Sequence, residues 1–107
     1  MRAQALPQEA EGSSKRSALK SPVAFKGPVE YDCTRARGGS ETLRATFYET
    51  TPAMAFVERD NQARPAFRVV SADGSRYEGP DLLFWEARGE ATVTWSGVDL
   101  TCKPRRT

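Results

Sequence analysis

The side chains that could carry out chemistry in this chain are few, because its 107 residues include no histidine. Ser–His–Asp triads, Cys–His dyads, imidazole metal sites and the usual neutral-pH general base are therefore excluded. The two cysteines, Cys33 and Cys102, lack the CxxC spacing of a metal or redox site. We therefore expect a protein that is not an enzyme and that holds no metal and no cofactor.

The cysteine pair has two interpretations. Cys33 and Cys102 are either two unrelated free thiols or one disulfide that encloses roughly 70 residues of chain. Such a loop contributes on the order of 4 kcal/mol in the chain-entropy formula, a large fraction of the stability of a small domain. A disulfide would place the protein in an oxidising compartment.

Length and charge narrow the class of protein further. A chain of 107 residues forms one small domain. Its 16 basic and 14 acidic residues give a net charge of +2, too weak a bias to indicate nucleic acid or an anionic membrane surface. The polar composition of residues 1–27 predicts a flexible N-terminal arm, and residues 28–107 form the folded domain.

From Val29 onward, apolar residues alternate with polar ones, which is typical of half-buried strands. The pattern predicts eight short strands in an all-β antiparallel meander, and eight strands close into a small barrel with a filled interior. The expected strands are 29–33, 43–47, 53–58, 66–70, 75–78, 82–86, 91–95 and 98–102.

Successive turns of a meander alternate between its two ends. The turns at Thr51-Pro52, Asp73-Gly74 and Arg88-Gly89 therefore share one end, and Asp73-Gly74 is the strongest hairpin dipeptide. The same parity makes the first and last strands antiparallel and puts Cys33 and Cys102 at matching positions along these two strands. This favours a disulfide that closes the barrel between the terminal strands.

Two stretches of the chain carry a family resemblance. They are Ala72-Asp73-Gly74-Ser75-Arg76-Tyr77 and Leu83-Phe84-Trp85-Glu86-Ala87-Arg88-Gly89-Glu90-Ala91, between a Tyr-Asp-Cys strand and a Leu-Thr-Cys strand. Together they resemble the bacterial C-type lysozyme inhibitors, the membrane-bound and periplasmic (MliC/PliC-like) family. That family has roughly Ser-Gly-x-x-Tyr, then Phe-Trp-x-Lys-Gly-x-x-Ala, between two disulfide-bonded cysteines. The chain departs from the pattern at Asp73, where serine is usual, and at Arg88, where lysine is usual.

The resemblance implies a barrel that plugs the active-site cleft of a C-type lysozyme, in the bacterial periplasm or anchored to the outer membrane of the cell envelope. The lysozyme-binding residues it implies are Asp73, Gly74, Ser75, Tyr77 and Arg88. Because a lysozyme cleft holds two catalytic carboxyls, the blocker needs a cation and neutral donors. Arg88 is expected as the cation, Ser75 or Asp73 as the hydrogen-bonding group, and Tyr77 as packing support.

Each of these residues also has a structural interpretation. Arg88 can be a solvated turn charge, Asp73 and Ser75 can serve the turn alone, and Tyr77 can pack half-buried against Trp85. Trp85 and Trp95 are expected in the core. The runner-up function is a small ligand-binding β-barrel of the cell envelope. Large side chains expected in the barrel interior argue against it, because they would fill the cavity that a ligand needs: Phe47, Phe67, Phe84 and Trp95.

The expected partner is C-type lysozyme, and no nucleic acid or metal is expected. The sequence leaves open a lipid anchor outside the visible sequence, a soluble periplasmic form and a homodimer.

Overall fold

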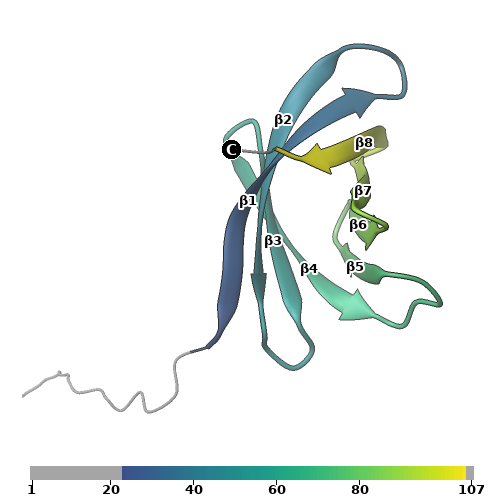
Figure 1. Cartoon of the computed structure of the whole chain (residues 1–107). Helices are drawn as coiled ribbons and strands as arrows, with labels where there is room; N and C mark the ends of the chain where they lie inside the picture. Colours follow the sequence, from purple (N-terminus) through teal and green to yellow (C-terminus); the bar gives the residue numbers. More distant parts are fainter. Residues whose placement is uncertain (1–22, 106–107) are drawn as a thin grey trace, which may run out of the picture.

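A computed structural model describes residues 23–105 of the chain, and these residues form eight antiparallel strands (Figure 1). The strands are β1 (Phe25–Arg35), β2 (Ser40–Tyr48), β3 (Met54–Arg59), β4 (Gln62–Val69), β5 (Ser75–Gly79), β6 (Leu82–Ala87), β7 (Glu90–Trp95) and β8 (Val98–Pro104). The described part of the chain contains no helix with the length and apolar character that crossing a bilayer requires.

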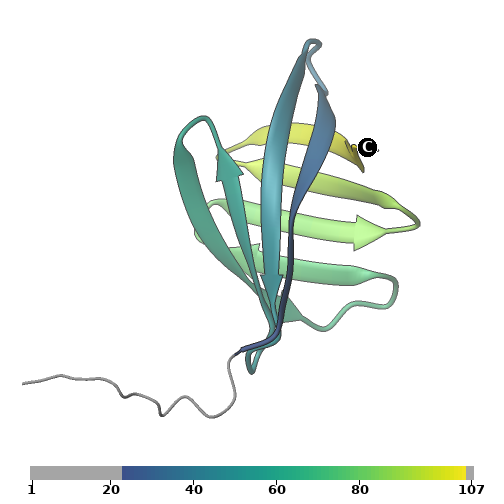
Figure 2. The same ribbon diagram turned by 60° about the vertical axis from the view of Figure 1, so that its left-hand side comes forward.

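Each strand pairs with the next one in sequence, and β8 pairs back onto β1, so the sheet is a closed barrel. Strands β1 to β4 run across the direction of β5 to β8 (Figure 2). The prediction of an eight-stranded antiparallel meander is confirmed. Closure leaves no unpaired strand edge around the barrel.

Tight turns explain why consecutive strands pair. In the turns Asp60-Asn61, Arg88-Gly89 and Ser96-Gly97, both central residues have positive φ, as a type I′ hairpin requires. The Asp73-Gly74 dipeptide does not form such a turn, because only Gly74 has positive φ. A longer loop, residues 70–74, joins β4 to β5 instead.

The interior of the barrel is filled by side chains from all eight strands, following the two-residue period of a pleated sheet. The largest fully buried side chains are Tyr31, Phe84, Leu100, Val57 and Val93, with Cys102. Phe47 and Trp95 are buried, as predicted. The expectation that Phe67 and Trp85 lie inside is wrong: Ala66 and Phe84 take the inward positions, so their neighbours Phe67 and Trp85 point outward.

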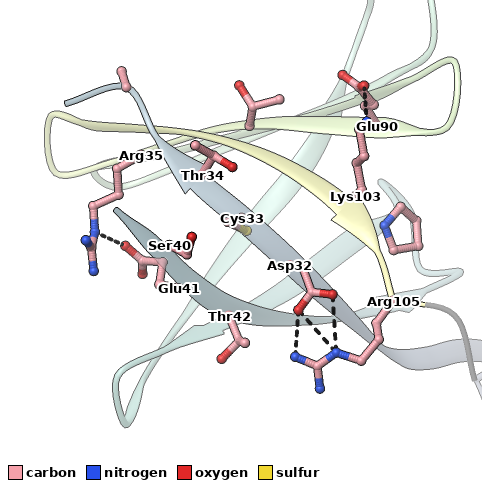
Figure 3. Close-up of a pocket in the computed structure, with 13 residues that line it drawn as sticks. Asp32, Cys33, Thr34, Arg35, Ser40, Glu41, Thr42, Glu90, Lys103 and Arg105 are labelled. Carbon is pink, nitrogen blue, oxygen red and sulfur yellow. Dashed lines mark hydrogen bonds and ion pairs between the residues drawn. The ribbon is translucent and has the colours of Figure 1, made fainter. Parts of the chain in front are cut away.

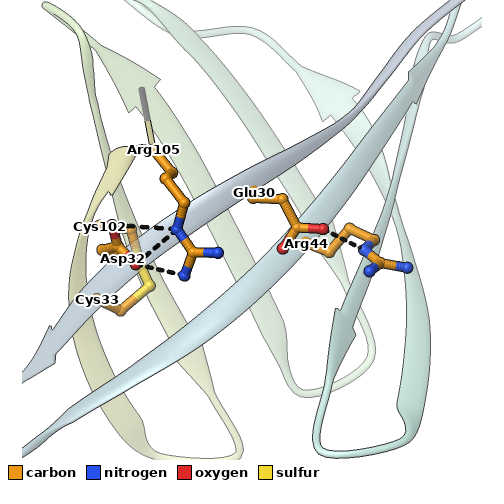
Figure 4. A network of polar contacts seen from close by, with 6 residues as sticks. All are labelled: Glu30, Asp32, Cys33, Arg44, Cys102 and Arg105. Carbon is orange, nitrogen blue, oxygen red and sulfur yellow. Dashed lines mark hydrogen bonds and ion pairs between the residues drawn. A yellow bond between two sulfur atoms is a disulfide. The ribbon is translucent and has the colours of Figure 1, made fainter. Parts of the chain in front are cut away.

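Cys33 and Cys102 are direct register partners on β1 and β8 and form a disulfide, which confirms the predicted closure. Ion pairs flank this bond on the outer surface (Figure 4). Arg105 Nη2 lies 2.7 Å from Asp32 Oδ1, and this hydrogen bond lowers the pKa of Asp32. On the other side of β1, Arg44 Nε lies 2.8 Å from Glu30 Oε2 and ties β2 to β1.

Strand β1 begins at Phe25, so it starts three residues before the domain expected from residue 28. Phe25 and Lys26 pair with Tyr48 and Phe47, and the register shifts between Lys26 and Val29. The rest of the predicted arm, residues 1–22, lies outside the described residues, and its character stays a prediction.

Candidate functional site

Two loops meet at one end of the barrel, as the parity of the turns predicts. The 70–74 loop and the Arg88-Gly89 turn adjoin the paired strands β5 and β6, in which Ser75 lies opposite Glu86. Both loops project on the same side in Figure 2. Arg88 Nη2 lies 3.1 Å from Asp73 Oδ2, so an ion pair joins the two loops. The structure thus brings together the two residues at which the chain departs from the family pattern.

Arg88 is presented to solvent at the tip of its hairpin. Its side chain is 84% exposed, and its φ of 54° places the backbone in the left-handed region that a type I′ turn needs. The side chain of Asp73 is 51% exposed. Since both charges stay in water, the pair contributes about 1 kcal/mol or less to folding. Its effect is to orient the guanidinium beside the 70–74 loop.

Gly74 brings that loop into direct contact with β6. Its φ is +67°, and a Cβ at this position would overlap the carbonyl oxygen of Glu86 and the side chain of Ala87. Only glycine combines this conformation with so close an approach. Gly74 therefore determines how close Asp73 lies to β6 and to the Arg88 turn that follows it.

Trp85 holds the backbone of the same loop from outside the barrel. Its Nε1–H donates to the carbonyl oxygen of Asp73 at 2.8 Å, and the hydroxyl of Ser71 donates to the same oxygen at 2.6 Å. The guanidinium of Arg76 covers the Trp85 ring at 5.3 Å. The sequence-based prediction missed this role, although the inward position of Phe84 puts Trp85 on the outer face.

Tyr77 lies beneath the loops as part of the core. Its residue is 7% exposed, and its ring packs 5.8 Å from Phe47 and 6.3 Å from Phe84. Burial raises the pKa of Tyr77. The expected packing against Trp85 is wrong, because Tyr77 and Trp85 point to opposite faces of the sheet. Tyr77 can support the loops, but little of its surface is open to a partner.

A carboxylate that the sequence did not single out lies at the base of both loops. Glu86, the register partner of half-buried Ser75, accepts a hydrogen bond from the hydroxyl of Tyr31, with 3.4 Å between Oη and Oε2. Tyr31 is 1% exposed, and burial together with the charge of Glu86 raises its pKa far above the ordinary value for tyrosine. The alternation of β6 places Glu86 on the same face as Phe84, which is the signal that could have found it.

Several charged groups elsewhere on the barrel form ion pairs. A hollow over β1, β2 and β8 is lined by the outer-surface pairs Asp32–Arg105 and Glu90–Lys103, and at one end of the barrel by the pair Glu41–Arg35 (Figure 3). None of the predicted lysozyme-binding residues lines it. Within residues 23–105, no three His, Cys, Asp or Glu side chains group as metal ligands.

The opposite end of the barrel is closed by arginines. Glu41, whose side chain is 9% exposed, binds Arg59 at 2.6 Å and Arg35 at 2.8 Å, and the hydrogen bond from Arg59 lowers its pKa. Arg64 lies 4.1 Å from the Trp95 ring. These contacts seal the core, whereas the end with Asp73 and Arg88 presents a cation and an acceptor to solvent.

Comparison with curated protein sequences gives no match. Among solved structures, the fold resembles that of Pseudomonas aeruginosa MliC, determined in complex with hen egg white lysozyme. The match has a TM-score of 0.53 and 24% sequence identity, and it covers 92% of this chain and all of the other. At this identity, the likeness supports the barrel fold.

Family membership comes from the sequence itself. Residues 31–101, about two thirds of the chain, match the family model described as membrane-bound lysozyme-inhibitor of c-type lysozyme. This confirms the resemblance inferred from the two loop motifs and the cysteines, and a membrane-bound family accords with a location in the cell envelope. The matched segment contains β2 to β7 entire, with both loops of the site. The chain belongs to the family of membrane-bound inhibitors of c-type lysozyme.

Proposed function

We propose that this barrel inhibits C-type lysozyme by inserting the Arg88-Gly89 turn and the 73–75 segment into the active-site cleft. The observation that carries the proposal is the ion pair between Arg88 and Asp73, which places one exposed cation and its neighbouring loop side by side on one end of a rigid barrel. Family membership supplies the class of target.

The chemistry of the cleft explains why a cation is needed. A lysozyme cleft contains a general acid with a raised pKa and an ionised carboxylate. A guanidinium that reaches this carboxylate exchanges water for a charge-assisted, bidentate hydrogen bond. Lysozymes of this type are usually basic, so local complementarity has to supply the affinity rather than long-range attraction.

Asp73 occupies the position at which the family usually has serine, and an unpaired carboxylate there would repel the catalytic carboxylates. In this chain Arg88 neutralises Asp73 at 3.1 Å. We propose that Asp73 orients Arg88 and that Ser75 supplies the hydroxyl donor. Gly74 permits the close approach of the loop to β6, and Tyr77 supports it from the core.

The test is titration of the protein into a C-type lysozyme while the clearing of a cell-wall suspension is followed. Arg88→Ala is expected to weaken inhibition by about 30-fold to several thousand-fold, because truncating one member of a buried charge pair costs roughly 2–5 kcal/mol. The matched control is Arg37→Ala, which removes an exposed arginine from the β1–β2 turn at the opposite end. Equal inhibition by both variants would contradict the assignment of the loops.

We further propose that the protein blocks lysozyme without cleaving cell walls itself, and that it works in the periplasm or from an outer-membrane anchor. The test of the first point is the cell-wall suspension with the protein alone, which should stay turbid. The second requires fractionation of the producing cells. A ligand-binding barrel remains the other candidate function, but the buried side chains of all eight strands occupy the interior that a ligand would need.

A further inference from the structure

We propose that this barrel itself rests on a phospholipid surface through one row of outward-facing apolar side chains. The apolar row consists of Phe25, Tyr48, Met54 and Phe67, one from each of β1 to β4. The proposal goes beyond the inhibition of lysozyme and does not depend on which loop enters the cleft.

The strand register places these four side chains in a continuous line. Phe25 pairs with Tyr48, Tyr48 with Met54, and Met54 with Phe67. The rings of Phe25 and Tyr48 are 6.0 Å apart. Neighbouring positions on β2, β3 and β4 point into the core, so the row lies on the outer face of the barrel.

Exposure of large apolar side chains is concentrated at this place. In residues 23–105, the large hydrophobic residues that are most exposed are Val23, Phe25, Phe67 and Val70. Phe25 is 62% exposed and Phe67 42%, and Val23 and Val70 are close to them in sequence. Single exposed apolar residues are ordinary, but a contiguous group with aromatic members marks a surface that binds a protein or a membrane.

Two cations lie beside the apolar row, at the mouth of the barrel. Lys26 Nζ is 5.5 Å from the centre of the Phe47 ring, and the Arg68 guanidinium is 5.9 Å from that of Tyr77. Glu78, the register partner of Phe67, is held by Arg76 at 3.0 Å. Aromatic side chains with flanking Lys and Arg are typical of surfaces at the membrane interface.

The place where the chain enters the barrel favours lipid over another occupant. Residues 1–22 connect through Val23 to Phe25, the first member of the row, and the family is membrane-bound. In Figure 2, β1 begins at the bottom of the barrel, whereas the β6–β7 turn projects to the side. A barrel seated on the apolar row therefore has the Arg88-Gly89 turn at its side, whereas the 70–74 loop, which follows β4, lies nearer to the row.

The experiment uses the full 107-residue chain without any lipid modification and vesicles of phosphatidylethanolamine and phosphatidylglycerol, separated by flotation. The parent chain is expected to float with the vesicles. Phe25→Ser combined with Phe67→Ser should reduce the bound fraction at least tenfold, because it removes the two exposed phenyl rings of the row. Leu83→Ser, at an outward position of β6 away from the row, is the matched control and should bind like the parent.

A second measurement does not depend on the folding of a variant. In the parent chain, vesicles should slow amide hydrogen exchange in residues 23–26, 48–54 and 67–70 and leave residues 83–95 unchanged. Lysozyme inhibition by the double variant should stay within twofold of the parent, which separates this proposal from the proposed function.

Any of three results would overturn the proposal. The first is a parent chain that does not float, and the second is a double variant that floats as well as the parent. The third is a parent that sediments as a dimer and does not bind vesicles, with a double variant that sediments as a monomer, which would assign the row to a second copy of the chain.

Discussion

Arg88 Nη2 lies 3.1 Å from Asp73 Oδ2, so the cation expected to meet lysozyme is already paired within the free inhibitor. The pair joins two loops that belong to different hairpins. Both side chains are at least half exposed. The Arg88 guanidinium can therefore leave the carboxylate of Asp73 for a carboxylate of the target at little cost in folding free energy. The pair therefore matters for binding more than for stability.

A double-mutant cycle at these two positions tests this role. Arg88→Ala alone removes the cation and leaves the charge of Asp73 facing the cleft carboxylates. We expect it to weaken inhibition more in the parent than in a chain that also carries Asp73→Asn, with a coupling of about 1 kcal/mol or more in the inhibition constants. The free energies of unfolding of Arg88→Ala and Asp73→Asn should differ from that of the parent by no more than about 1 kcal/mol. Additive effects on inhibition would show that Asp73 does not face the target.

The indole of Trp85 gives a second prediction. Trp85→Phe keeps an aromatic ring beside Arg76 but removes the donor to the Asp73 carbonyl oxygen. The free energy of unfolding should fall by about 0.5–1.5 kcal/mol, the usual contribution of one hydrogen bond. Inhibition should weaken several-fold, because the 70–74 loop loses its outer attachment. Thr92→Val, at the register partner of Trp85 on β7, is the control and should leave inhibition unchanged. Unchanged inhibition by Trp85→Phe would show that the loop keeps its position without this bond.

Residue alternation and turn chemistry predicted the barrel well, because both are local properties of the sequence. The parity of seven turns sufficed to bring Asp73 and Arg88 to one end and Cys33 next to Cys102. The expectation for Phe67 and Trp85 fails because each follows another apolar residue, Ala66 or Phe84, and only one of two adjacent strand residues can point into the core.

The contacts of the site could not be predicted in the same way. The ion pair of Asp73 with Arg88 and the hydrogen bond from Tyr31 to Glu86 join residues on different hairpins, and their geometry depends on the shear of the closed sheet. Parity assigns a loop to an end of the barrel, but it does not give the distance between two side chains there.

The disulfide gives a third prediction. The bond joins strands β1 and β8 over a sequence separation of 69 residues. Cys33→Ala combined with Cys102→Ala should lower the free energy of unfolding by on the order of 4 kcal/mol, because the open chain gains entropy when it unfolds. The measurement is urea denaturation of the parent, the reduced parent and the double variant. The reduced parent should match the double variant, and two thiols that react with an alkylating agent in the native parent would contradict the bond.

Tyr31, buried beneath the site, makes the stability of the fold depend on pH in the alkaline range. Burial and then the charge of Glu86 raise the pKa of Tyr31 above its value in the unfolded chain, about 10. The folded state therefore keeps a proton that the unfolded state loses. The stabilising effect is fully present below about pH 10 and is lost as the pH rises above it, with a slope of up to about 1.4 kcal/mol per pH unit for this one proton.

Tyr31→Phe removes this titration and keeps the ring that packs 5.8 Å from Phe84. At pH 8 the variant should be less stable than the parent by about 0.5–1.5 kcal/mol, because Glu86 loses its hydrogen-bond donor. Above about pH 10 the stability of the variant should fall less steeply, so that the two curves approach and cross. Urea midpoints at pH 8, 10, 11 and 11.5 measure both curves. Parallel curves over this range would mean that Tyr31 ionises as readily in the folded protein as in the unfolded chain.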